Sequence, residues 1–494
     1  MASTDGMNVL EEVGGDETSE TAAAVPTSDW WTKFRRSKQL VVAVVFVAMM
    51  SDLIGMASID PLLPAILTKM DHDATVAASG ADDGGYSDAT VNATDLRHGR
   101  LQSANVTETS RVESRVGYII ALKPATEMIA NIIVGAVVAK VGHRLPMMGG
   151  CIFNTASTLG FAYAPNFTFL IVACVCQAIA SSMSVVSGLA LISSTFPDQT
   201  ERSAAMSTAF GGLTLGLVLG YPYGSVSYQF FGRQIPFIGL AVLSLADGFF
   251  RLLIASPPST DNPPEEEEAN SVKVYCQLLR DPYIAVALLC NFAPSFALGV
   301  FLATGPAWML SELNAAQWQI GCVIAFALFF QIGAQILTGR YSLHYGRWIF
   351  CMMGLWTYAV GLFIYPACGT IWMLIGPEIL TRAGCGMVIC VISPLLSYLV
   401  DIRHDSNYGE VFGLYTASYN MALMVGAVLS GYAIKYISFS LLYRSVGAFM
   451  VVVSFSTIAF RNPKPRNLDT EKATKRNYQS FSATESTDLH MIED

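Results

Sequence analysis

Apolar blocks of about 20 residues recur along this chain, and a helix needs about 20 such residues to cross the hydrocarbon core of a bilayer. These blocks constrain the fold strongly, because a backbone in lipid must satisfy its hydrogen bonds within its own segment. Only 14% of the 494 residues are charged and 53% are apolar, against roughly 25% charged in an average soluble protein. The pattern predicts an all-α membrane protein and excludes a cytosolic enzyme, a nucleic-acid binder and a disulfide-rich secreted module.

Polar breaks between the apolar windows predict twelve transmembrane helices. Their ranges are 40–67, 116–138, 146–164, 167–193, 204–227, 235–255, 282–304, 318–338, 348–366, 370–400, 410–432 and 439–460. The first block follows an acidic segment too long for a cleaved signal, so it is expected to remain as a signal-anchor helix.

The net charge of −9 lies largely outside these helices. Of the 38 acidic residues, 18 lie in three segments, 1–30, 256–272 and 467–494. Segments rich in Ser, Thr, Glu and Pro cannot bury a core. We therefore expect disordered acidic tails at 1–38 and 462–494 and an acidic linker at 256–280. This acidity keeps the segments soluble and does not describe a binding site.

The basic residues indicate how the chain is oriented. They gather before the first helix, after the last helix and in the even-numbered connections, which is the pattern of cytosolic segments. We expect both termini in the cytosol and the loop 68–115 in the lumen or outside. That loop carries two glycosylation sequons, at Asn92 and Asn105.

A short basic connection occurs twice. Gly135 and Gly142 bracket the first, between the second and third helices, and Gly339 and Gly346 bracket the second, 204 residues later. Six helices, a linker and six related helices are the plan of a transporter whose halves are related by an axis along the membrane normal. The expected halves are 39–255 and 281–461.

The fifth predicted helix carries a glycine at every fourth residue. The set consists of Gly212, Gly216, Gly220 and Gly224, with Pro222 between the last two. Glycines four apart share one face and let another helix approach closely, and proline bends a helix. The segment is either a packing seam alone or, together with the repeated basic loops, resembles the antiporter motif of the major facilitator superfamily.

Ionisable residues at membrane depth are costly and mark functional sites. Asp52 lies about 18 Å into the first helix at about 1.5 Å per residue, and Lys123 and Glu127 share one face of the second. The others are Asp60, Asp247, Glu378, Arg382 and Glu410. No histidine lies in a helix interior, so an intramembrane proton carrier must be a carboxylate. Lys123 and Glu127 are either a structural ion pair or, with Asp52, a proton-exchanging group.

Several short motifs carry a family resemblance. They are Asp52 with Pro61-Leu-Leu-Pro64, Arg115-Val-Gly117 with Lys123, Gly211 to Gly224, Asp281-Pro-Tyr283, Gly346-Arg-Trp348, and Tyr398-Leu-Val-Asp401-Ile-Arg403-His404 with Tyr408-Gly409. The last string, which contains Asp401 and Arg403, is the most specific. Across about residues 38–462 the chain resembles the vesicular monoamine and acetylcholine transporters of the major facilitator superfamily.

The resemblance implies a major facilitator fold of two six-helix bundles. It also implies proton-coupled antiport that loads a small organic cation, such as a biogenic amine, into acidic synaptic or secretory vesicles. Protons, the cation and the lipid bilayer would be the partners of a monomer, with no nucleic acid, cofactor, metal or enzymatic activity. By resemblance, Asp52 is the helix-one carboxylate that serves the amine, Lys123 belongs to its charge network, and Tyr419 lines the pocket.

The chain departs from the family's charged positions. Neutral residues stand where the family has ionisable ones, at Cys174, Leu302, Ile389 and Thr416. The charged residues Asp60, Glu127, Glu378 and Arg382 stand where the family usually has neutral ones. Either Asp52 and Glu127 titrate in place of the lost carboxylates, or the protein moves a zwitterion or another solute whose carboxylate contacts Arg382. A third interpretation is a scaffold or sensor that does not transport.

Overall fold

Each predicted apolar block corresponds to a helix in the structure. The computed structural model describes residues 37–59, 62, 66–67, 70, 121–253, 271–404, 407–434 and 436–463. Over these residues it is built from helices without strands, which confirms the all-α fold. The glycosylation sequons at Asn92 and Asn105, Asp60, and most of the predicted tails lie outside the described residues.

Within the described part, 11 helices are long and apolar enough to cross a membrane. They are α2 (Lys38–Ile59), Ala121–Val141, α6 (Phe167–Thr195), α7 (Gln199–Phe231), α8 (Gln234–Leu252), α10 (Pro282–Ser311), α11 (Gln317–Tyr345), α12 (Arg347–Ile364), α13 (Ile375–Arg403), α14 (Tyr408–Ala433) and α15 (Phe439–Ser456). Short 3₁₀ turns, Tyr365–Ala367, Ile371–Leu374 and Thr457–Arg461, extend α12, α13 and α15. A further helix, α5 (Arg144–Tyr163), packs against α6 and α8 and occupies the third predicted position.

Helices extend beyond the predicted apolar windows where a polar residue caps the helix end. Helix α7 begins at Gln199, five residues before position 204, because the carboxylate of its N-cap, Asp198, accepts hydrogen bonds from the backbone N–H groups of Thr200 and Glu201. The linker 256–280 needs a larger correction. Its last ten residues form α9 (Ser271–Arg280), a helix that buries Leu278 against the bundle and packs on α10 and α14.

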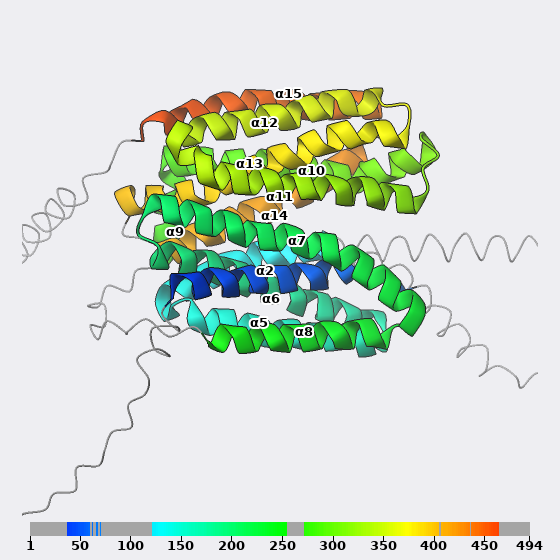
Figure 1. Ribbon diagram of the computed structural model, residues 1–494, viewed down its shortest axis with the longest axis horizontal. Coiled ribbons are helices and arrows are strands. Elements are labelled where there is room, and N and C mark those ends of the chain that lie inside the picture. Colours follow the sequence, from blue (N-terminus) through cyan, green and yellow to red (C-terminus); the bar gives the residue numbers. More distant parts are fainter. Residues whose placement is uncertain are drawn as a thin grey trace, which may run out of the picture.

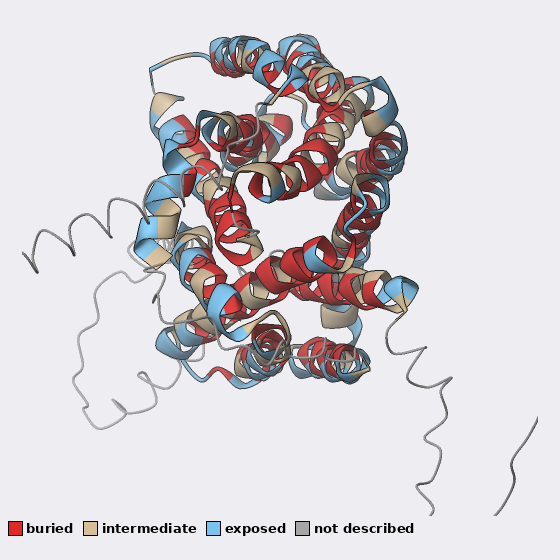
Figure 2. Cartoon of the chain, turned by 90° about the vertical axis from the view of Figure 1, so that its left-hand side faces the viewer, coloured by how far each residue is buried: buried red, intermediate tan, exposed pale blue. Residues whose placement is uncertain are grey.

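The helices form two halves that lie side by side (Figure 1). One half holds α2, α5, α6 and α8, the other holds α10, α12, α13 and α15, and α7, α11 and α14 lie along the boundary. Figure 2 looks along the helices and shows buried residues between helices and exposed ones on the outside. Large apolar side chains on the outside, such as Ile133 and Phe230, are what a lipid-facing surface requires.

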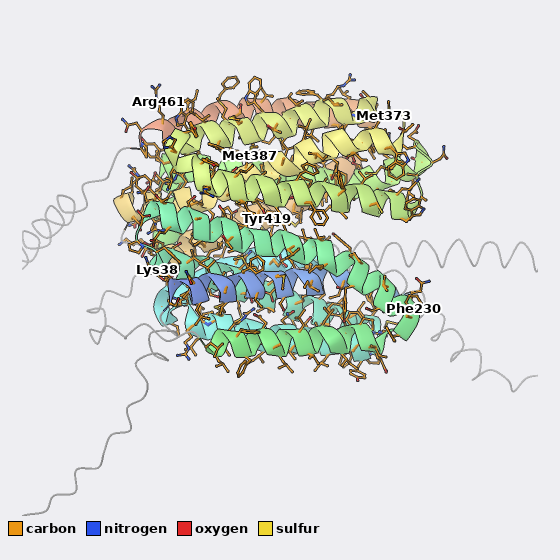
Figure 3. The ribbon with its side chains drawn as sticks, viewed as in Figure 1. Lys38, Phe230, Met373, Met387, Tyr419 and Arg461 are labelled. Atoms are coloured by element: carbon orange, nitrogen blue, oxygen red, sulfur yellow. The ribbon has the colours of Figure 1, made fainter. Side chains whose placement is uncertain are left out.

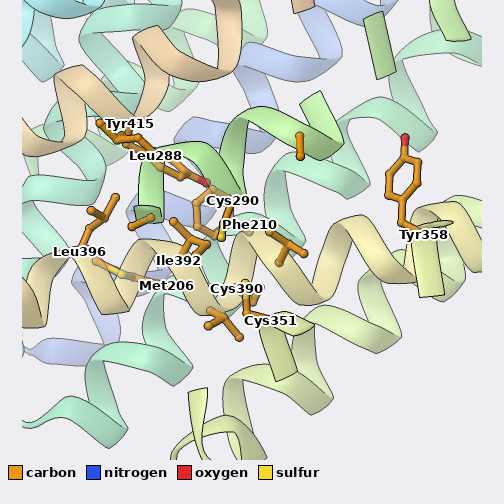
Figure 4. Packing of buried hydrophobic residues seen from close by; sticks show 14 of the residues in the cluster. Met206, Phe210, Leu288, Cys290, Cys351, Tyr358, Cys390, Ile392, Leu396 and Tyr415 are labelled. Carbon is orange, nitrogen blue, oxygen red and sulfur yellow. The ribbon is translucent and has the colours of Figure 1, made fainter. Parts of the chain in front are cut away.

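Basic side chains gather at one end of the helices, which we call the basic end: Lys38, Arg202, Arg347, Arg403 and Arg461. Figure 3 shows Lys38 and Arg461 at this end and Phe230 and Met373 at the opposite end. Near the basic end the two halves share one hydrophobic core, in which Met206 and Phe210 of α7 join Cys390 and Ile392 of α13 (Figure 4). A separate, smaller core around Phe161 and Phe237 belongs to the first half alone.

The repeated glycines lie where the halves cross. A Cβ atom built on Gly135 would lie 2.7 Å from the carbonyl oxygen of Gly409 in α14, and one on Gly339 would lie 2.0 Å from Oγ of Ser207 in α7. Gly142 and Gly346 turn the chain at φ +83° and +106°, a region that favours glycine. The 204-residue repeat therefore supplies, in each half, one close crossing and one tight turn.

Candidate functional site

Helix α2, which carries Asp52, packs closely against α7, and we call this contact the α2–α7 seam. Cβ atoms built on Gly212, Gly216 and Gly220 would lie 2.6, 2.6 and 2.8 Å from the carbonyl oxygens of Phe46, Met50 and Ile54. Gly224 meets Ser58 in the same way. The every-fourth glycines therefore form the packing face for α2, and Pro222 lies inside the continuous helix α7.

The Asp52 carboxyl lies inside the first half, beside two charged groups of α8. Nη2 of Arg251 is 2.5 Å from Oδ2 of Asp247 and 3.8 Å from Oδ1 of Asp52. The three side chains are only 1% to 3% exposed. We call Asp52, Asp247 and Arg251 the buried triad.

Polar side chains from α5, α6 and α8 hold the buried triad in place. Nη1 of Arg251 donates to the Met147 carbonyl oxygen at 2.6 Å and to Oγ of Ser184 at 2.8 Å. Nδ2 of Asn154 donates to Oδ1 of Asp52 at 3.3 Å. Oδ2 of Asp52 and Oδ1 of Asp247 are buried without a hydrogen-bond partner among the described residues.

Sequence reasoning singled out Asp247 but missed Arg251. The signal was available, because an acid followed by arginine four residues later places both on one helix face, and the Glu378–Arg382 pair has the same spacing. Lys123, expected in the charge network of Asp52, donates from Nζ to Oε1 of Gln177 at 3.3 Å, and its positive charge also acts on Asp52. Glu127 is buried one turn further along the same helix, at 9% exposure.

Glu378 and Arg382 form a second buried pair, in the other half. Nε of Arg382 donates to Oε1 of Glu378 at 2.9 Å, and the guanidinium lies 5.3 Å from the ring centroid of Phe301. The pair lines a pocket with Tyr358, Leu362, Tyr365, Thr381 and Tyr443. This pocket lies among α10, α12, α13 and α15, within one half. Tyr419 lies elsewhere, midway along the molecule near the boundary between the halves (Figure 3).

Asp401 joins the halves at the basic end. It accepts from Nη1 of Arg202 in α7 at 2.6 Å and from the Tyr408 hydroxyl. Ser193 and Ser397, which are 204 residues apart, also meet across the boundary with their hydroxyl oxygens separated by 2.9 Å. The basic end is closed by these contacts.

Arg403, in contrast to Arg202, contacts a residue of its own half, Asp281 at the start of α10. Burial raises the pKa of Asp281, but hydrogen bonds from His404, Arg403 and the Tyr283 backbone N–H outweigh it and hold that pKa at about 2. The distances are 2.5 Å from Nε of Arg403 and 3.0 Å from Nε2 of His404 to Oδ2 of Asp281. Asp281 therefore stays ionised at neutral and mildly acidic pH, and it fixes the start of α10.

Metal-ligating side chains do not gather in the described ranges: no three His, Cys, Asp or Glu residues are placed to hold an ion. What the structure offers is a set of buried charges on helices and a closed crossing between two halves. Buried charges beside the interface between two related halves are typical of membrane transporters.

The fold and the paired halves define a transporter of the major facilitator type. The family model of the Major Facilitator Superfamily matches residues 45–401 and 287–487. The structure of the human organic anion transporter MFSD10 (TETRAN) superposes with a TM-score of 0.69 at 15% identity, covering 85% of this chain and 99% of that one. This similarity shows the fold alone.

Sequence comparison gives the nearer relatives. The human chromaffin granule amine transporter is 33% identical over 71% of this chain and 66% of its own length. The human synaptic vesicular amine transporter is 28% identical over 92% of this chain and 96% of its own, and a probable vesicular acetylcholine transporter of Danio rerio is 28% identical over 86% and 79%. The chain belongs to the major facilitator superfamily, as a divergent member of the vesicular amine and acetylcholine transporter family.

Proposed function

We propose that this protein is a proton-coupled antiporter that loads a small organic cation, of the biogenic amine type, into an acidic vesicle lumen by alternating access. Asp52 is the residue at which proton and cation compete. Both termini and the basic end face the cytosol in this proposal, so the described conformation is closed on the cytosolic side. The names of the relatives support the amine as substrate class and the vesicle as location.

The net charge of the buried triad is the observation that carries the proposal. Two carboxylates and one guanidinium leave one negative charge at a site that is almost fully buried. A buried charge without a partner is costly, because protein interiors solvate ions far less well than water does. One proton or one ammonium group on Asp52 neutralises the excess, and the two cannot occupy the carboxyl together.

The available driving force is adequate for this exchange. One pH unit is worth about 1.4 kcal/mol per proton, and about 100 mV adds about 2.3 kcal/mol per charge moved. The outward movement of protons from an acidic lumen therefore supplies several kcal/mol for concentrating a monovalent cation.

Uptake into proteoliposomes with an acidic lumen tests the proposal. Wild-type protein is expected to accumulate a radiolabelled monoamine, and collapse of the pH gradient with an ammonium salt is expected to abolish uptake. Asp52→Asn should lose it, since an amide binds neither proton nor ammonium as a carboxylate does. Glu201→Gln, which removes an exposed carboxylate at the start of α7, is the matched control. Uptake by Asp52→Asn at the wild-type rate contradicts the proposal.

A zwitterionic or other carboxylate-bearing solute is the second candidate. It is favoured by Arg382, which lines the pocket and donates from Nε to Glu378, because a guanidinium has further N–H groups that can bind a carboxylate. The buried Tyr365 hydroxyl, which lines the same pocket, also has no described partner. Uptake of amino acids in place of monoamines, lost in Arg382→Gln, would select this candidate. Absence of uptake for every solute class would select the non-transporting scaffold.

A further inference from the structure

Arg251 is among the largest fully buried side chains of the molecule. Its guanidinium is shared unequally between two carboxylates, at 2.5 Å from Asp247 and 3.8 Å from Asp52. Asp247 is four residues away on the same helix, so α8 itself maintains that contact. Asp52 belongs to α2, and its distance from Arg251 changes with any small movement of α2 against α8.

The hydrogen bonds of Arg251 are also unequally divided. Nε donates to Asp247 at 2.8 Å, and Nη1 donates to α5 and α6 through the Met147 carbonyl and Ser184. Nη2 is buried between the two carboxylates, in ion-pair contact with Oδ2 of Asp247 at 2.5 Å and 3.8 Å from Oδ1 of Asp52, and neither contact has the geometry of a hydrogen bond. A displacement of about 1 Å would bring Nη2 within hydrogen-bonding distance of Oδ1 of Asp52. Asp247 and Asp52 therefore compete for the same guanidinium nitrogen, and in this conformation Asp247 holds it more closely.

The other elements packed around Asp52 contribute no competing ion pair in the described structure. From α5 come Asn154 and the thiol of Cys151, from α6 comes Ser184, and α7 presents its glycine face. Lys123, on the helix Ala121–Val141, is hydrogen-bonded to Gln177 and acts on Asp52 through its charge without an ion-pair contact; Glu127 lies one turn beyond it. The described cation within 4 Å of the Asp52 carboxylate is Arg251.

We propose that Arg251 is a positioning residue that serves as an internal counter-ion for Asp52 and competes there with the proton and with the transported cation. When Asp52 is empty, Arg251 shifts toward it and lowers the cost of the buried charge. When Asp52 binds a proton or an ammonium group, Arg251 returns to Asp247. Asp247 is the residue that keeps Arg251 from remaining on Asp52. The inference rests on the proposed role of Asp52 and adds the group that sets its affinity.

Two variants separate this role from a merely structural one. Asp247→Asn removes the carboxylate that retains Arg251, so Arg251 pairs with Asp52 and the site becomes neutral. The pH midpoint of uptake should move toward acid by about one unit, a tenfold change in proton affinity, and KM for the cation should rise about as much. Asp247→Asn combined with Arg251→Gln leaves Asp52 as the single charge, and the midpoint should move toward alkaline pH by a similar amount.

The opposite signs of the two displacements test the proposal. Displacement in the same direction, or a loss of kcat with unchanged midpoints in both variants, overturns it. Glu201→Gln is the control and should leave the midpoint unchanged.

A second measurement separates this inference from the proposed function. The apparent melting temperature of the purified protein, followed against pH, should show the same opposite displacements, and both should disappear in an Asp52→Asn background. If the melting curves behave so while no amine is taken up, the amine proposal fails and the role of Arg251 stands. If amine uptake is found but the melting curves and midpoints coincide, the role of Arg251 fails alone.

Discussion

Substitution of two adjacent glycines in α7 tests whether the α2–α7 seam is as tight as the structure indicates. A Cβ built on Gly212 would lie 2.6 Å from the carbonyl oxygen of Phe46 and 2.8 Å from Cδ2 of its ring. A Cβ built on Gly211 meets no atom within 4 Å. The two positions share one helix and one membrane depth, but only Gly212 faces α2.

The magnitude follows from two opposing effects. Replacing glycine by alanine in a helix stabilises it by about 1 kcal/mol, and this gain is common to both positions. Overpacking costs about 1–3 kcal/mol, and it applies only at Gly212, because the Phe46 carbonyl oxygen belongs to a helical backbone and cannot rotate away. Gly212→Ala should therefore be less stable than Gly211→Ala by about 1–3 kcal/mol.

The assay is unfolding of the two purified variants and of wild type in one detergent and at one heating rate, since thermal unfolding of such proteins is often irreversible. Gly211→Ala is expected to melt at or above the wild-type temperature and Gly212→Ala below it. Amine uptake should fall in the same order, because α2 carries Asp52. Equal melting temperatures for the two alanine variants would refute the close approach of α2 and α7.

Three further predictions concern the basic end. Gly339→Ala should prevent its closure and slow transport, because the new Cβ would lie 2.0 Å from Oγ of Ser207; Ser207→Gly should restore the rate, and no rescue would contradict the contact. Cysteines at Ser193 and Ser397, whose oxygens are 2.9 Å apart, should cross-link under oxidation and stop uptake until reduced; unimpeded uptake by cross-linked protein would contradict alternating access. Since the folded pKa of Asp281 is about 2 against an ordinary value of 3.8, its stabilising contribution is present above about pH 4 and lost only toward pH 2. Asp281→Asn should therefore lower the melting temperature at both pH 5.5 and pH 7.5, and an unchanged melting temperature at either pH would refute this.

The fold was largely predictable because its determinants are local. Apolar windows located the helices, and the caps that extend them, such as Asp198 before α7, lie within a few residues of the positions they serve. The glycine spacing predicted a close helix contact, and the structure identifies α2 as the partner. The ten-residue helix α9 was missed, since a short amphipathic segment in an acidic linker gives no long apolar window.

The candidate site was predictable only in part. Asp52 was found because a carboxylate in an apolar helix is conspicuous, and the pair Glu378–Arg382 could be inferred from its spacing along one helix. Arg251 near Asp52 could not be inferred in this way, because the two residues lie on different helices. Lys123, which sequence reasoning placed in the charge network of Asp52, is hydrogen-bonded to Gln177 and acts on Asp52 through its charge.

By itself the sequence determined the membrane-spanning class, the helices, the repeat and the residues able to carry charge within the bilayer. These follow from hydropathy and spacing, which act over a few turns of chain. Only the tertiary structure decided which charges meet between helices: Asp52 with Arg251 inside one half, and Arg202 with Asp401 between the halves. The physical reason is that a buried charge pairs with whatever the packing of its helix brings within a few ångströms, and that packing depends on surfaces far apart in the chain.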